Sequence, residues 1–355
     1  MWIKRIYIRK FRNIEEQVLE FSPEYNIFRG GNGQGKTNLL EAVYFSGYAR
    51  SFRTRTLQHL KADFDKADTL STGVIIDDNN VEKNYRIELK GKKKIWADDI
   101  ETDFSELLEE NLFITFIPDD IRIVKNDPVY RRRFLNELCS QYFPGYFDEL
   151  IRFRKILNAR NRLLKDRRPF HIWDDMFVES GNRIISSRIQ MMERLKEIFP
   201  KIWKDVSMEK EDVSLEYKGD RFLDNKVLME QRAADISRGY TTVGPHRADL
   251  EIRLNGHDVR KSASRGQLKT IIFSLKMTQG NICGEIKKTK PVIILDDVFS
   301  ELDSVRQKKY LDYMGHSHQI FISTTDDELC LPGNNNKLFF IREGKTDEGK
   351  VFKTG

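Results

Sequence analysis

The chain has 355 residues, of which 39% are hydrophobic and 33% charged, so it can bury the core of one large domain or two beneath a very polar surface. Its net charge of +6 suits a polyanionic partner without establishing one. Cys139, Cys283 and Cys330 have no metal-ligand spacing, which indicates a reducing compartment and excludes a disulfide framework. The sequence shows no apolar signal region and no apolar run of about 18 residues, so we expect a cytoplasmic protein with no membrane partner.

The first recognisable feature is a glycine-rich loop between a strand and a helix. We expect strands at 2–11, 18–21 and 25–28. A helix follows over 38–45, with apolar positions four residues apart. The loop before this helix fits G-x-x-x-x-G-K-[ST] with Gly30, Gly31, Asn32, Gly33, Gln34, Gly35, Lys36 and Thr37. This context predicts a nucleotide-binding P-loop.

The residue types of the P-loop match the chemistry of a triphosphate. Glycines let the backbone approach a polyanion closely, and N–H groups at the helix start face the phosphates. Lys36 is placed to reach the β- and γ-phosphates, and the hydroxyl of Thr37 is placed to ligate Mg²⁺.

The middle of the chain combines a hairpin with a long helical segment. Residues 73–76 and 85–89 are expected to pair as a hairpin, and 113–117 to form a short strand. Most of 128–200 is expected to be helical. Residues 151–170 hold the basic side chains Arg152, Arg154, Lys155, Arg160, Arg162, Lys165, Arg167 and Arg168, against the single acid Asp166.

A helical surface of this basicity is a candidate face for contacting DNA. Our candidate DNA-binding residues are Arg152, Arg154, Arg160 and Arg162. The alternative is a solvated helix exterior or a surface for an acidic partner, and charge alone does not decide between these.

The later part of the chain returns to strands. We expect a strand at 213–217 and a helix around 224–237. The segment Gly244-Pro245-His246-Arg247 leads into a strand at 250–254 and an Asn-Gly turn. A loop of Ser264, Arg265, Gly266 and Gln267 then precedes an amphipathic helix, which is an anion-binding geometry but a weak signal by itself.

An apolar run at 291–295 ends in two acids, Asp296 and Asp297. This pattern predicts a buried parallel strand that brings carboxylates to the edge where a P-loop holds Mg²⁺. Asp296 is placed to bind Mg²⁺ or its water, and Asp297 to orient or deprotonate the attacking water. Further strands are expected at 319–322, which ends at Ser323-Thr324-Thr325, and at 338–341. Residues 343–355 are expected to form a charged, frayed tail.

Together these motifs resemble ABC-type ATPases and, within them, the RecF family of bacterial DNA replication and repair. The resemblance spans nearly the whole chain. The matching segments are Lys10-Phe11-Arg12-Asn13, the P-loop with Asn38, Ser51-Phe52-Arg53, Arg131-Arg132-Arg133-Phe134-Leu135, Gly244-Pro245-His246-Arg247-x-Asp249-Leu250, Ser264-Arg265-Gly266-Gln267, and Asp296-Asp297 with Ser300-Glu301-Leu302-Asp303. The Gly-Pro-His-Arg segment is the most specific of these.

The resemblance implies a mechanism based on a dimer. ATP would lie between the P-loop of one copy and the signature residues of another, here Ser264, Arg265, Gly266 and Gln267. Asp303 would help shape the subunit interface, and Thr324 or Thr325 would contact the γ-phosphate. The dimer would bind gapped DNA or single-strand/double-strand junctions, act with RecO and RecR in loading the recombinase, and support SOS induction.

Two residues depart from the pattern of most ABC ATPases. Arg265 stands where most signatures have glycine, a charged form that RecF-like chains share. Asp297 stands where many have a catalytic glutamate, and its shorter carboxylate suggests a weak, DNA-stimulated ATPase with slow hydrolysis.

The expected fold class is α/β, an ABC-type ATPase head with a mixed β-sheet core and an inserted, mainly helical lobe. We expect 1–104 and 241–355 to form the ATPase lobe, and 105–240 the helical lobe with DNA or dimer contacts. The main alternative is an ABC ATPase subunit coupled to a membrane or other non-DNA machine. A structural maintenance ATPase would need a long coiled coil, and a small-molecule kinase would not use the Ser-Arg-Gly-Gln loop.

Overall fold

The computed structural model describes residues 1–61, 69–166, 168–207, 211–299, 302–315, 318–326, 331 and 335–348. The chain divides into two compact units. The first unit contains residues 1–120 and 279–355, and the second contains 121–278. No helix in the described ranges is both long enough and apolar enough to cross a membrane.

The core of the first unit is a six-stranded mixed sheet. In spatial order its strands are β15 (Lys345–Glu348), β14 (Asn336–Arg342), β3 (Tyr25–Arg29), β13 (Ile320–Thr324), β12 (Val292–Asp296) and β8 (Phe113–Phe116). All neighbours from β14 to β8 are parallel, and only β15 is antiparallel. Every residue of β12 and β13 is buried, which explains their continuous apolar sequences.

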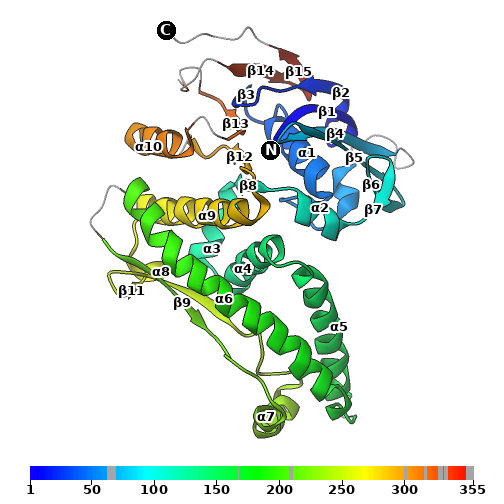
Figure 1. Ribbon diagram of the computed structural model, residues 1–355, viewed down its shortest axis with the longest axis vertical. Coiled ribbons are helices and arrows are strands. Elements are labelled where there is room, and N and C mark those ends of the chain that lie inside the picture. The colour runs from blue at the N-terminus through cyan, green and yellow to red at the C-terminus, as the bar shows by residue number, and fades with distance from the viewer. Residues whose placement is uncertain are drawn as a thin grey trace. The chain divides into compact units, whose positions relative to one another are not determined.

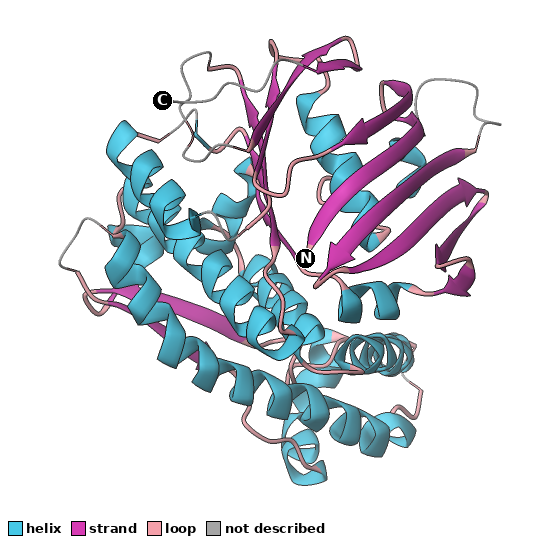
Figure 2. Cartoon of the chain, turned by 45° about the horizontal axis from the view of Figure 1, so that its top comes forward, coloured by secondary structure: helices cyan, strands magenta, loops and turns pink. Residues whose placement is uncertain are grey.

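A second six-stranded sheet in the first unit is wholly antiparallel (Figure 2). In spatial order its strands are β2 (Ile14–Glu20), β1 (Trp2–Phe11), β4 (Leu70–Asp78), β5 (Val81–Lys90), β6 (Lys92–Ala97) and β7 (Ile100–Thr102). The predicted hairpin is confirmed as β4 and β5. Its turn residues Asn79 and Asn80 have φ angles of 54° and 66°, because a two-residue turn of this hand needs positive φ at both positions.

Helix α1 (Lys36–Tyr48) lies between the two sheets of the first unit (Figure 1). It contacts β1, β4 and β5 of the antiparallel sheet and β12 and β13 of the mixed sheet. Because it is covered on both sides, almost every residue of α1 is buried. The other helices of this unit are α2 (Phe104–Glu110) and α10 (Ser304–Met314).

The second unit is mainly helical, with a small antiparallel sheet. Its helices are α3 (Ile121–Lys125), α4 (Pro128–Tyr142), α5 (Tyr146–Lys165), α6 (Asp174–Val206), α7 (Asn225–Arg238) and α8 (Val259–Ser262). Its strands follow the order β11 (His257–Asp258), β10 (Asp249–Leu254) and β9 (Val213–Lys218). Helix α9 (Arg265–Lys287) begins in the second unit and ends in the first.

The unit boundaries differ from the lobes expected from the sequence. Residues 241–278 were expected with the P-loop, but they group with the helices of the second unit. The cause is strand pairing, because β10 pairs with β9 over its whole length and also contacts α4. The signature residues therefore belong to the second unit.

The expected frayed tail is wrong for its first part. Residues 345–348 form β15, which pairs with β14. Its side chains are mostly charged and exposed, as is common for an edge strand, so no apolar alternation marked it in the sequence. Residues 349–355 lie outside the described residues.

Candidate nucleotide site and signature loop

The P-loop joins β3 to α1, as the sequence predicted. Gly35 is the N-cap residue of α1, and its φ of 112° is accessible mainly to glycine. A Cβ atom at this position would also lie 2.8 Å from Nδ2 of Asn13. Among the described residues no side chain caps this end of α1, so the first helical N–H groups are available to an anion.

Lys36 folds back onto the P-loop that carries it. Its Nζ donates hydrogen bonds to the carbonyls of Gly30 at 2.7 Å and Gly31 at 2.9 Å. Burial lowers the pKa of Lys36, while the nearby carboxylates of Asp297 and Asp296 oppose this shift. The ammonium group is therefore already enclosed by the loop and close to negative charge.

Thr37, Asp296 and Ser323 meet at one edge of the mixed sheet. Strand β13 lies between β3 and β12, so these parallel strands bring their carboxyl ends together. The hydroxyls of Thr37 and Ser323 each donate to Oδ1 of Asp296 at 2.8 Å. Burial raises the pKa of Asp296, and these two hydrogen bonds act in the opposite direction. A hydroxyl and a carboxylate are hard oxygen donors, so this pair fits Mg²⁺.

Asp297 follows β12 in a left-handed conformation with φ of 52°. Its backbone N–H donates to Oγ of Ser323 at 2.9 Å. One hydroxyl thus connects both acids that the sequence singled out. The sequence placed Ser323 only at a strand end, because it did not show that β13 lies beside β12.

Thr324 and Thr325 also stand at this edge. Thr324 is the last residue of β13, is buried, and pairs in register with Arg29 just before the P-loop. Its hydroxyl accepts a hydrogen bond from the N–H of Asp326 at 2.9 Å. Thr325 lies beyond the strand and is exposed.

A second layer of polar contacts supports α1. Arg12 makes two hydrogen bonds of 2.9 Å to the fully buried carboxylate of Glu41. Arg53 donates to Oδ1 of Asn38 at 2.8 Å and lies 3.4 Å from Glu41. The segments containing Arg12 and Arg53 therefore meet on α1. Glu41 was missed because it appeared to be a surface position on an amphipathic helix.

The signature residues form the start of α9. The N–H of Ser264 donates to Oε1 of Gln267 at 2.6 Å, and the N–H of Gln267 donates to the Ser264 hydroxyl at 3.2 Å. This reciprocal arrangement is a capping box. Gln267 also donates to Glu211 at 2.6 Å. Ser264 and Arg265 are exposed, so the end of α9 presents them at the surface of the second unit.

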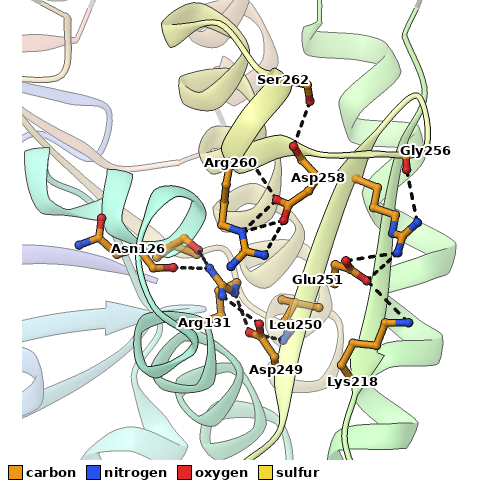
Figure 3. A network of polar contacts seen from close by, with 12 residues as sticks. Asn126, Arg131, Lys218, Asp249, Leu250, Glu251, Gly256, Asp258, Arg260 and Ser262 are labelled. Atoms are coloured by element: carbon orange, nitrogen blue, oxygen red, sulfur yellow. Dashed lines mark hydrogen bonds and ion pairs between the residues drawn. The ribbon is translucent and has the colours of Figure 1, made fainter.

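The chain just before the signature residues belongs to a polar network (Figure 3). Asp258 accepts from the N–H of Arg260 at 2.9 Å and caps α8. Arg131, which is 3% exposed, binds both oxygens of Asp249 at 2.7 and 2.9 Å and the carbonyl of Asn126 at 2.6 Å. The arginine-rich segment and the Gly-Pro-His-Arg-x-Asp segment therefore contact each other through Arg131 and Asp249.

Arg160 is not a DNA-contacting residue, contrary to our expectation. Its side chain is 0% exposed. Its guanidinium donates to Asp174 at 2.9 Å, to Asp235 at 2.8 Å and to the Thr241 hydroxyl at 2.6 Å. The helical period gives the reason, since Phe153, Ile156 and Leu164 are also buried and share this face of α5. Charge density concealed a core position.

The other candidates on α5 remain at the surface. Arg154 and Arg162 are exposed, and Lys165 lies on the same helical face. Arg152 is 41% exposed and lies 3.5 Å from Glu179. Arg167 lies outside the described residues.

His246 takes part in the interior of the second unit. It lies against the rings of Phe153 and Phe177, and its Nε2 is 3.0 Å from the carbonyl of Thr241. Burial lowers the pKa of His246 to about 4. The ring is therefore neutral at physiological pH. The segment most specific to the resemblance serves here to connect helices.

Asp303 caps α10 in the first unit. Its carboxylate accepts from the N–H of Arg306 at 2.9 Å and forms an ion pair with the Arg306 side chain at 2.5 Å. These hydrogen bonds lower the pKa of Asp303. Ser300 and Glu301 lie outside the described residues.

Comparisons with known proteins agree with this arrangement. Residues 2–347 match the family model for the RecF/RecN/SMC N terminal domain. DNA replication and repair protein RecF of Halothermothrix orenii is 36% identical, over 97% of this chain and 98% of that protein. The protein of the same name from Streptococcus pneumoniae is 32% identical over the same shares.

Solved structures agree as well. The recombination mediator protein RecF with ATP, of the RecFOR pathway, superposes with a TM-score of 0.88 at 31% identity, over 98% of each chain. An Smc head bound to the C-winged helix domain of ScpA superposes with a TM-score of 0.59 at 15% identity, which shows a shared fold. The fold and the site define the head of an ABC-type ATPase. Within that class, the chain belongs to the RecF family.

Proposed function

We propose that this chain is an ATP-dependent DNA-binding protein of replication and recombinational repair, acting in the cytoplasm. The observation that carries the proposal is the meeting of Thr37, Asp296 and Ser323 beside an enclosed Lys36. Four segments distant in sequence supply phosphate-binding and metal-binding groups to one sheet edge. Membership of the RecF family and the names of its relatives support DNA as the partner.

In this proposal the first unit binds the phosphates of ATP. The N–H groups from Gly33 to Thr37 face the phosphates, and Lys36 exchanges its carbonyl partners for phosphate oxygens. Thr37 and Asp296 would hold Mg²⁺, which neutralises charge on the phosphates. Ser323 holds Asp296 in place through its 2.8 Å hydrogen bond.

Hydrolysis would depend on Asp297. Its backbone is fixed by Ser323, and its exposed side chain follows directly after β12. We assign it the orientation or deprotonation of the attacking water. An aspartate reaches less far than a glutamate, so slow turnover is expected, with DNA as a stimulator.

Dimerisation would complete the site. Ser264 and the first N–H groups of α9 form an exposed helix start, which suits a phosphate supplied by another copy. We propose that Ser264, Arg265, Gly266 and Gln267 contact the ATP bound to that copy. Asp303 and one of Thr324 or Thr325 are proposed to shape the interface and sense the γ-phosphate. ATP would then join two copies, and hydrolysis would release them.

The exposed bases of α5 are the proposed DNA surface. Arg154 and Arg162 can contact backbone phosphates without reading sequence, with Arg152 beside them. We expect a preference for gapped DNA or single-strand/double-strand junctions. RecO and RecR proteins are the proposed partners, with recombinase loading and SOS induction as the downstream effects.

The decisive experiment is the mass of the protein in solution, measured with and without ATP and Mg²⁺, and then with gapped DNA. The proposal expects a monomer, an ATP-dependent dimer, and a dimer on DNA. A monomer under all conditions, or binding of ATP with no affinity for DNA, would contradict it. The second outcome would favour a subunit of a different machine.

A further inference from the structure

The P-loop is contacted by a turn near the end of the described chain. Glu343 and Gly344 connect β14 to β15, and their φ angles are 50° and 77°. A two-residue turn with positive φ at both positions fits the twist of a hairpin. Strand β14 runs beside β3, so this turn lies next to the loop that leaves β3.

Two backbone N–H groups of the turn donate to a single P-loop residue. The N–H of Gly344 donates to the carbonyl of Gln34 at 2.8 Å. The N–H of Glu343 donates to Oε1 of Gln34 at 2.9 Å. Nδ2 of Asn13 also lies 3.4 Å from the Gln34 carbonyl. The middle of the P-loop is thus held from outside by groups that do not belong to it.

Glycine is required in the turn by space as well as by conformation. A Cβ atom on Gly344 would lie 2.3 Å from the carbonyl oxygen of Asn13. The turn is also held on its other side, where Gln17 donates to the carbonyl of Gly344 and accepts from the Thr346 hydroxyl at 2.7 Å. Any side chain at Gly344 would therefore displace the turn or the Asn13 segment.

These contacts fix the orientation of a phosphate-binding group. In a planar trans peptide the C=O and the following N–H point in opposite directions. Because the carbonyl of Gln34 is held by the turn, the N–H of Gly35 points away from the turn. Glycine adopts positive and negative φ with similar ease, so peptides beside Gly33 and Gly35 would otherwise reorient at little cost.

We propose that the Glu343–Gly344 turn is a positioning element for nucleotide binding, because it holds Gln34 and thereby keeps the Gly35 N–H directed for phosphate. This inference rests on the proposed ATP site. The turn touches the P-loop and not the phosphate, so its residues are positioning residues. The expected effect of losing the turn is on nucleotide affinity.

The test compares two glycine substitutions with the same backbone cost. Gly256 is the second residue of the Asn-Gly turn between β10 and β11, with φ of 78°, and a Cβ there would meet nothing within 4 Å. Gly344→Ala and Gly256→Ala therefore share the strain of positive φ, and only the first disturbs the P-loop. The measurement is ADP affinity by calorimetry, because ADP binding needs no second copy under our proposal.

We expect Gly344→Ala to weaken ADP binding by about tenfold, and Gly256→Ala to leave it within about twofold. In steady-state assays Gly344→Ala should raise KM for ATP while kcat at saturation stays near that of the wild type. Equal ADP affinity in the two variants would overturn the inference.

A second variant covers the case in which Gly344→Ala does not fold. Gln17→Ala removes the support on the outer side of the turn and leaves every P-loop residue intact. We expect ADP binding about threefold weaker, with unchanged thermal stability of the second unit. Wild-type ADP affinity in Gln17→Ala would then refute the inference. Failure of the wild-type protein to bind ADP at all would refute the proposed ATP site instead.

Discussion

The P-loop and the signature loop are held in place differently. The P-loop receives hydrogen bonds from Asn13 and the Glu343–Gly344 turn, while Thr37 and Asp296 join its helix to a neighbouring strand. At the signature loop, the described bonds of Ser264 are to Gln267, and Gln267 also contacts Glu211. The first loop is organised to receive a ligand from within its unit, whereas the second presents an exposed helix start.

This difference teaches how a nucleotide can control assembly. A preorganised site binds its ligand without first paying to order the loop. An exposed helix start contributes only when another molecule brings a phosphate to it. The polar residues of the second unit follow a similar division, because Arg160 and His246 are interior whereas Ser264, Arg154 and Arg162 are exposed.

The largest expected effect is at the organised site. Lys36→Ala should weaken ATP binding by roughly 100-fold or more, because it removes the ammonium group that neutralises phosphate. Calorimetry measures the loss, and circular dichroism should show an unchanged fold. Lys92→Ala, on the antiparallel sheet, is the control. Wild-type affinity in Lys36→Ala would sink the P-loop assignment.

Ser264→Arg should separate the two loops. Monomers should still bind ATP with wild-type affinity, while ATP-dependent dimers should be absent in light scattering, because a bulky cation replaces the capping serine. Ser237→Arg, on the exposed side of α7, introduces the same charge elsewhere in the second unit. Normal dimers in Ser264→Arg would show that the signature loop does not complete the site.

Asp297→Asn should separate binding from turnover. We expect kcat about 100-fold lower, with ATP affinity and dimerisation preserved, because the side chain acts on the water and not on the phosphates. ATP-bound dimers should persist longer than those of the wild type. A turnover rate equal to that of the wild type would move the role to another group.

Arginines of α5 allow a comparison within one helix. Charge reversal at both Arg154 and Arg162 should weaken DNA binding about tenfold and lower the salt slope by about 2. Arg160→Glu should instead destabilise the protein by about 3–5 kcal/mol, because it leaves Asp174 and Asp235 unpaired and adds a buried charge. Gel shifts at several salt concentrations and urea unfolding measure the two effects. Unchanged DNA binding by the double reversal would place the DNA surface elsewhere.

The smallest expected effect concerns pH. His246 has a pKa of about 4 in the folded protein against an ordinary value of 6.5, so the unfolded chain takes up a proton first as pH falls. Its contribution to stability is complete above pH 6.5 and declines towards pH 4. Between pH 7 and 5 the wild type should lose about 1–2 kcal/mol more than His246→Gln, which does not titrate. Urea unfolding at both pH values measures this, and parallel losses would contradict it.

Local sequence patterns carried much of the site. The P-loop spacing identified Lys36 and Thr37, and the apolar run before Asp296 identified a buried strand. Both signals are local, because a phosphate loop needs adjacent glycines and a buried parallel strand needs contiguous apolar residues. The Asn255-Gly256 turn was recognisable for the same reason.

Other features depended on contacts between distant segments. Ser323 joins Asp296 to Asp297 only because β13 lies beside β12. Helical periodicity could have placed Arg160 in the interior, but its partners Asp174 and Asp235 come from two other helices.

The sequence by itself determined the class of ATPase, the P-loop and the two acids, since each is encoded by neighbouring residues. Only the tertiary structure decided that the signature loop belongs to the second unit, that Arg160 is buried, and that Gly344 supports Gln34. The physical reason is strand and helix packing. Hydrogen bonds between residues 34 and 344 arise from the parallel pairing of β14 with β3, which no local pattern of either segment specifies.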